Sequence, residues 1–171
     1  MSCQKLLPRR GSGLPVAVLF LMWVLAASQG QAAEEGTFTG TWIVSGQRQM
    51  QDFLSERDVF TFRVQGHVNL TNNLGEVADF WSQCAGIWDE RTGSEGRCVW
   101  RSPEGEKAFI VLRGRLMEEN IEVVAEVVGG TGSLKGVQGH FKFTWTSVFI
   151  DPDTHNLTAH TENIEGSYRI P

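Results

Sequence analysis

Apolar and polar residues alternate along most of the chain beyond residue 36. In the clearest segment, Phe60, Phe62 and Val64 alternate with Thr61 and Arg63. An alternation of period two is typical of a strand with one buried face. The same pattern predicts eight strands, at residues 37–44, 59–70, 76–88, 97–101, 107–116, 121–128, 140–145 and 157–170.

Helical periodicity is almost absent from the same region. No window of eleven residues keeps apolar positions at the i, i+3, i+4 and i+7 spacing of an amphipathic helix. Residues 47–56 form the one stretch that could hold a helical turn. The pattern therefore predicts an all-β domain.

Short turns join most of the predicted strands, so consecutive strands are expected to be antiparallel neighbours. Eight such strands in up-and-down order, each with one apolar face, close most economically into a β-barrel. A β-sandwich is the alternative, because strand periodicity is the same in both architectures.

Five glycines interrupt the pattern between two strands: Gly129, Gly130, Gly132, Gly136 and Gly139. A phosphate-binding loop would need a helix directly after the glycines. Three residues separate Gly132 from Gly136 and a strand follows, so the segment is interpreted as a structural corner.

This GGTG corner, followed by an alternating aromatic strand, resembles the signature of the allene oxide cyclase and dirigent barrel superfamily. Residues 84–109 look like the bacterial exported members, whereas Leu134 stands where the family usually has Phe or Tyr. The resemblance implies an eight-stranded barrel with an apolar lumen, often assembled as a homo-oligomer. Its known enzymes steer cyclisation or coupling of hydrophobic, oxygenated intermediates. None of their catalytic residues can be matched to positions in this chain.

The first 32 residues have the features of a secretory signal peptide. Lys5, Arg9 and Arg10 precede an apolar run at residues 14–27, and small residues follow. The run is shorter than the ~20 residues of a membrane span. We therefore expect cleavage after Ala32 or Ala33, a barrel domain at residues 33–171 without a stable membrane span, and a periplasmic or secreted protein. An uncleaved N-terminal anchor is the alternative.

The charge of the chain bears on its partners. The net charge of −5 becomes −8 without the three basic residues of the signal peptide. An acidic domain offers no electrostatic surface to nucleic acid. The remaining candidates are a small apolar ligand or a partner protein, and no cofactor is predicted.

Two of the three cysteines, Cys84 and Cys98, remain after signal cleavage. In an exported chain they are expected to form a disulfide. The short loop between them would give a stabilisation of about 3 kcal/mol in the chain-entropy model. The alternative is a pair of metal-binding thiols, but the sequence offers no further ligand nearby.

Polar residues of the last strand are the candidates for chemistry. His160 and Glu162 share a phase with Ile164 and Tyr168, so an unbroken strand would bring all four into the lumen. A His and a carboxylate could act as an acid–base pair, and the single tyrosine could donate a hydrogen bond. If the strand bulges before Ile164, His160 and Glu162 instead meet water. His67 and His140 lie on the polar faces of their strands and are expected to face solvent.

Two hypotheses about function follow. The first is a binding or structural module that holds a small apolar ligand or a partner protein. The second is a cyclase- or dirigent-type enzyme, in which a shaped apolar lumen positions a reactive intermediate. The tryptophans of the predicted strands serve either as core residues or as the aromatic lining of a cavity.

Overall fold

The computed structural model describes residues 33–54, 56–117 and 120–171. The predicted signal peptide lies outside these residues. The described chain forms nine strands: β1 (Glu34–Leu54), β2 (Arg57–Asn72), β3 (Val77–Asp89), β4 (Gly93–Arg101), β5 (Lys107–Leu116), β6 (Ile121–Gly130), β7 (Gln138–Thr144), β8 (Ser147–Ile150) and β9 (Asn156–Ile170). One short 3-10 helix, Gly132–Leu134, lies between β6 and β7.

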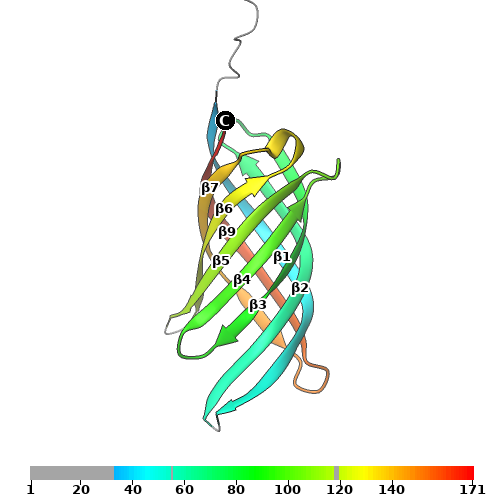
Figure 1. Cartoon of the computed structure of the whole chain (residues 1–171), viewed down its shortest axis with the longest axis vertical. Helices are drawn as coiled ribbons and strands as arrows, with labels where there is room; N and C mark the ends of the chain where they lie inside the picture. Colours follow the sequence, from blue (N-terminus) through cyan, green and yellow to red (C-terminus); the bar gives the residue numbers. More distant parts are fainter. Residues whose placement is uncertain (1–32, 55, 118–119) are drawn as a thin grey trace, which may run out of the picture. The chain divides into compact units, whose positions relative to one another are not determined.

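Eight of these strands close into an antiparallel barrel (Figure 1). Strands β1 to β7 pair in sequence order, β7 pairs with β9, and β9 pairs with β1. Closure leaves none of these eight strands as a free edge. The predicted fold class, an antiparallel up-and-down β-barrel, is confirmed, and the sandwich alternative is wrong.

The ninth strand, β8, is a four-residue addition that pairs with the first part of β9. It pairs with β9 in the same register as β7 does. Gln138 of β7 faces Arg169, and Ile150 of β8 faces Leu157. Strands β7 and β8 therefore follow one another along β9, with a break at residues 145–146.

The one helical turn considered from the sequence, at residues 47–56, is wrong. Gln47 to Gln51 continue β1 and pair with Arg63 to Val59 of β2. The two strands form a long hairpin at the lower end of Figure 1. The paired strand supplies hydrogen-bond partners for the polar backbone of this segment, so a weak local preference for a helix does not decide its structure.

Side chains of even number on β1 to β5 and of odd number on β6 and β7 point into the barrel. An aromatic belt crosses the interior at mid-height, formed by Trp42, Trp100, Phe141 and Phe143, all nearly inaccessible to solvent. Ring centroids of Trp42 lie 5.5 Å from those of both Trp100 and Phe143, and Trp100 lies 5.1 Å from Phe141.

A buried serine anchors the belt to the wall. Trp42 Nε1 donates to Ser82 Oγ at 2.8 Å, and the Ser82 hydroxyl donates to the carbonyl of Gly66 at 3.0 Å. Gly66 has no side chain because β1 and β2 approach closely there: a Cβ would lie 1.8 Å from the Ile43 carbonyl oxygen.

The glycine corner joins β6 to β7 and is fixed to the start of β5. Gly132 has a φ of +62°, and a Cβ there would meet the Glu106 carboxylate. That carboxylate accepts hydrogen bonds from the backbone N–H of Ser133 at 2.8 Å and from its hydroxyl at 2.5 Å. These bonds hold the pKa of Glu106 below its usual value. The corner is architectural, as its sequence indicated.

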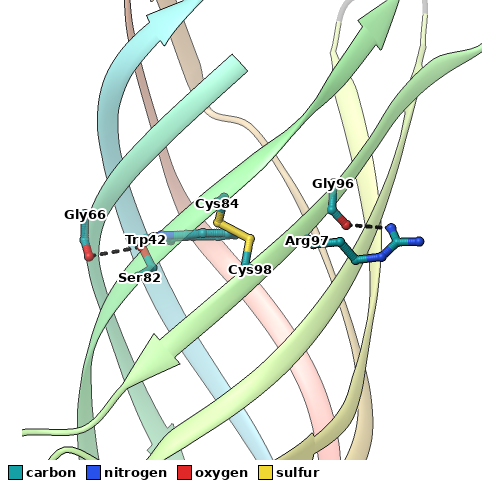
Figure 2. Close-up of a disulfide and its surroundings, with 7 residues drawn as sticks. All are labelled: Trp42, Gly66, Ser82, Cys84, Gly96, Arg97 and Cys98. Carbon is teal, nitrogen blue, oxygen red and sulfur yellow. Dashed lines mark hydrogen bonds between the residues drawn. A yellow bond between two sulfur atoms is a disulfide. The ribbon is translucent and has the colours of Figure 1, made fainter. Parts of the chain in front are cut away.

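Cys84 and Cys98 form a disulfide across β3 and β4 (Figure 2). The two residues face each other in the register, with Cα atoms 4.1 Å apart, and both point into the barrel. The predicted disulfide is confirmed, and it links the two strands of one hairpin.

In the part of the chain that the structure describes, no helix is long and apolar enough to span a membrane.

Candidate ligand cavities in the barrel lumen

The barrel interior holds two cavities, one on each side of the aromatic belt. They share no lining residue. The first, which we call the β8 cavity, has a volume of about 230 Å³ and lies at the end where β8 and the β1–β2 hairpin are found. The second, the Tyr168 cavity, has a volume of about 290 Å³ and lies at the end where the chain terminates. The lumen is therefore divided into two chambers.

The β8 cavity is almost entirely apolar. Trp88 and Trp145 line it, and Ser94 contributes the one hydroxyl among its lining residues. Apolar side chains make up the rest of the wall: Trp42, Val44, Phe60, Phe62, Val64, Leu112, Ile121, Val123, Phe143, Val148, Ile150, Leu157 and Ala159, together with Cys84. Such a wall favours binding of an apolar ligand but supplies few groups for proton transfer.

One cation stands near this cavity. Arg48 continues the inward row of Trp42 and Val44 along β1, and its guanidinium lies over the Phe60 ring, 5.4 Å from the centroid. Its Nε is buried, and no acceptor among the described residues bonds to it. Sequence reasoning missed Arg48 because its segment was considered as a helical turn. Extending the alternation of β1 by two steps would have found it.

The Tyr168 cavity has an apolar interior and a polar mouth. The Tyr168 hydroxyl donates to Glu34 Oε1 at 2.9 Å, and Asn72 Nδ2 donates to Glu76 Oε2 at 2.8 Å. All four of these residues line the cavity. Burial, and then the hydrogen bond to Glu34, raise the pKa of Tyr168. Its hydroxyl is therefore a neutral donor at physiological pH.

The structure places the three candidate residues of the last strand in two different environments. Tyr168 lies in the lumen, whereas His160 and Glu162 lie on the outer surface. His160 Nε2 is 3.7 Å from Glu162 Oε1, and the side chains keep 34% and 69% of their exposure. His160 and Glu162 therefore do not enter the lumen. A catalytic role for either residue stays a prediction.

A bulge in β9 causes this separation. Gly40 of β1 pairs with Ile164, and Trp42 pairs with Thr161, so one residue of β1 faces both Glu162 and Asn163. The inward positions change from odd to even across this point, because an extra residue reverses the alternation. In a strand without the bulge, His160 and Glu162 would point inward. In the structure Thr161, which lies between them, points inward instead.

Other positions agree with the sequence reading. His67 and His140 are exposed, as predicted. The tryptophans serve both suggested purposes: Trp42 and Trp100 are core, and Trp88 and Trp145 line the β8 cavity. Trp81 does neither. It lies on the outer face, with 37% of its surface exposed and its ring 4.7 Å from that of His67.

Two solved structures are similar to this chain, and both are dirigent proteins. The pterocarpan synthase dirigent protein GePTS1 matches 84% of this chain and 89% of its own length, with 13% sequence identity and a TM-score of 0.46. The pterocarpan synthase dirigent protein PsPTS1 matches 84% of this chain and 97% of its own, with 16% identity and a TM-score of 0.37. No protein-family model and no curated protein matches the chain.

Metal chemistry has no visible site in the described residues. They contain no group of three His, Cys, Asp or Glu side chains placed to hold a metal ion. The two cysteines considered as thiol ligands are joined in the disulfide. The two cavities offer a ligand apolar walls, the Ser94 hydroxyl in the β8 cavity and the polar side chains at the mouth of the Tyr168 cavity.

Proposed function

We propose that this protein is an exported binding module that holds a small apolar ligand in the β8 cavity. The observation that carries the proposal is an unfilled apolar chamber of about 230 Å³ inside a closed barrel. A core that served packing alone would be filled to the density of an organic crystal, with few voids larger than a water molecule. Ligand sites are concave, apolar and largely pre-formed.

The size and the wall of the cavity indicate the kind of ligand. Drug-sized ligands occupy pockets of roughly 300–1,000 Å³, so this chamber suits a smaller molecule. Aromatic rings of Phe60, Trp88 and Trp145 form much of its lining. Apolar surface transferred from water contributes about 25 cal/mol per Å², and rings stack on aromatic walls. A small aromatic or branched aliphatic molecule therefore fits best.

Export is part of the proposal. It is supported by the signal-like residues 1–32 and by the disulfide, since disulfides persist in oxidising compartments. N-terminal sequencing of protein recovered from outside the cytoplasm should begin at Ala33 or Glu34. An intact N-terminus would contradict cleavage and leave an anchored protein.

Ligand binding can be tested with a neutral fluorescent probe, N-phenyl-1-naphthylamine. Its emission should rise on binding and fall when a smaller apolar competitor displaces it. Two buried alanines give a matched pair of variants: Ala159 lines the β8 cavity, and Ala108 lines the Tyr168 cavity. Ala159→Leu should weaken probe binding at least tenfold, since lost contacts of about 1.4 kcal/mol suffice for that factor. Ala108→Leu should leave it unchanged.

Equal binding by both variants and the unaltered protein would overturn the assignment of the probe to this cavity. Near-ultraviolet circular dichroism of each variant checks that the aromatic core is intact. No probe binding by the unaltered protein would leave a scaffold function for the barrel.

The second candidate is a cyclase- or dirigent-type enzyme. One observation favours it: the Tyr168 hydroxyl donates to a carboxylate at the mouth of an apolar cavity, so a phenol and a carboxylate are placed together. Mass spectrometry of molecules that co-purify would separate the two functions. A single unaltered ligand supports a binding module, whereas a substrate and its isomer together support an enzyme.

A further inference from the structure

The mouth of the Tyr168 cavity carries two carboxylates that no cation neutralises among the described residues. Glu34 and Glu76 both line the cavity. Each accepts one hydrogen bond from a neutral donor, Glu34 from Tyr168 and Glu76 from Asn72. Neighbouring Glu35 differs, because it lies on the outer face and pairs with Arg169 at 3.3 Å. Two carboxylates therefore face the same opening.

The interior behind this mouth is apolar and rich in aromatic rings. Phe38, Phe80 and Trp100 contribute three of them, and the Tyr168 ring lies 6.3 Å from that of Phe38. Trp100 is almost completely buried, and its indole N–H has no acceptor among the described residues. The aromatic rings of this interior form an apolar wall, which suits the apolar or aromatic part of a ligand.

From this arrangement we propose that the Tyr168 cavity is a second binding site, specific for an amphipathic cation: a protonated amine on an apolar or aromatic body. An ammonium group offers three donors, which match the unused acceptor positions of the two carboxylates. Aromatic faces also attract cations through their quadrupoles. The apolar body would occupy the chamber of about 290 Å³ below the mouth.

The β8 cavity differs, because no carboxylate is among its lining residues. Near the β8 cavity, Arg48 brings a guanidinium over Phe60, with no carboxylate of the described chain in an ion pair with it. The two chambers thus differ in the charged side chains next to them and not in their apolar walls. This second site goes beyond the proposed function, which concerns the β8 cavity.

Three probes that share one tail test the proposal: n-octylammonium, n-octanol and n-octanoate, titrated calorimetrically at pH 7. Because a hydrogen bond to a charged group strengthens binding by about tenfold, the ammonium should bind about tenfold tighter than the alcohol, and octanoate more weakly than either. The Glu34→Gln/Glu76→Gln double variant should lose this preference, so that the ammonium and the alcohol bind about equally. Glu35→Gln, the adjacent control, should retain it.

The alanine pair assigns the site. Ala108→Leu should remove the ammonium-selective binding, and Ala159→Leu should leave it intact. The proposal is overturned if the ammonium and the alcohol bind equally, if the double glutamine variant keeps the preference, or if Ala159→Leu removes it. Failure of this test would leave the probe result for the β8 cavity standing, since the two chambers have separate walls.

Discussion

A single ion pair at the β8 end shows how one side chain depends on its partner. Arg57 Nε donates to Asp89 Oδ1 at 2.9 Å, and its terminal nitrogen contacts the other carboxylate oxygen. The side chains retain only 19% and 16% of their exposure. The hydrogen bond from Arg57 is the main cause that lowers the pKa of Asp89 to about 2.

This pKa predicts an acid-dependent contribution to stability. A carboxyl whose pKa falls on folding stabilises the native state above its unfolded pKa, about 3.9 for Asp. That contribution disappears as the pH falls through the folded value of about 2. Asp89→Asn should therefore be less stable than the unaltered protein at pH 6, and the difference should shrink towards zero near pH 2. Urea unfolding at several pH values measures it.

The control is Asp79→Asn on the exposed face of the same strand, which forms no ion pair with any described residue. Its stability difference from the unaltered protein should stay small across the range. A pH-independent deficit in Asp89→Asn would show that the residue acts through packing instead of charge.

At the scale of an element, the bulge in β9 determines which residues enter the lumen. Thr161 is fully buried, and its hydroxyl lies 2.8 Å from the carbonyl of Thr144 and 2.7 Å from Asn163 Oδ1. Asn163 Oδ1 also accepts the backbone N–H of Thr144 at 2.9 Å. These bonds satisfy the backbone where β7 ends, which stabilises the bulge and keeps Glu162 outside.

Thr161→Val tests the role of that hydroxyl. The two side chains have similar shapes, but valine leaves the part-buried carbonyl of Thr144 without this donor, which costs about 1–3 kcal/mol. We expect the free energy of unfolding, from urea denaturation, to fall by that amount. Thr158→Val, on the exposed face of the same strand, should change it by less than about 0.5 kcal/mol. Equal effects would mean that the bulge does not depend on the Thr161 hydroxyl.

At the scale of the whole molecule, the aromatic belt both fills the barrel and divides it. Trp42 contacts the rings of Trp100, Phe143 and Trp145, each with centroids 5.5 Å away. It therefore joins opposite walls of the barrel through one side chain. Its indole N–H is satisfied by Ser82, so the belt has a defined orientation.

Removing the Trp42 ring should weaken the whole barrel. Trp42→Ala is expected to lower the free energy of unfolding by about 3–5 kcal/mol, the usual cost of deleting a buried aromatic side chain. Trp42→Phe keeps a ring but leaves Ser82 without its donor, and should cost less. Urea denaturation followed by circular dichroism measures both. Trp81→Ala, on the outer face, is the control and should cost least; a loss as large as that of Trp42→Ala would contradict a central role for the belt.

The sequence by itself determined the all-β class, the antiparallel order and the position of the glycine corner. Strand periodicity records which side chains are buried, and that pattern is local, so residues such as Phe60 and Phe62 reveal it without a structure. The disulfide was predictable for a similar reason, because two cysteines flanking one turn are brought opposite each other by the hairpin.

The candidate site was not predictable to the same extent. Tyr168 was found because its phase with Ile164 and Ile170 is local. Glu34, Asn72 and Glu76 were missed, since only the fold brings the start of β1 and the turn between β2 and β3 to one mouth. The division of the lumen by the belt is likewise a matter of packing between distant strands.

Only the tertiary structure decided that His160 and Glu162 lie outside the lumen. An extra residue in a strand reverses its alternation, and whether the strand accepts it depends on hydrogen bonds from its neighbours, here Thr144 with Thr161 and Asn163. Local pattern establishes that a strand exists, whereas contacts between strands establish which of its faces reaches the lumen.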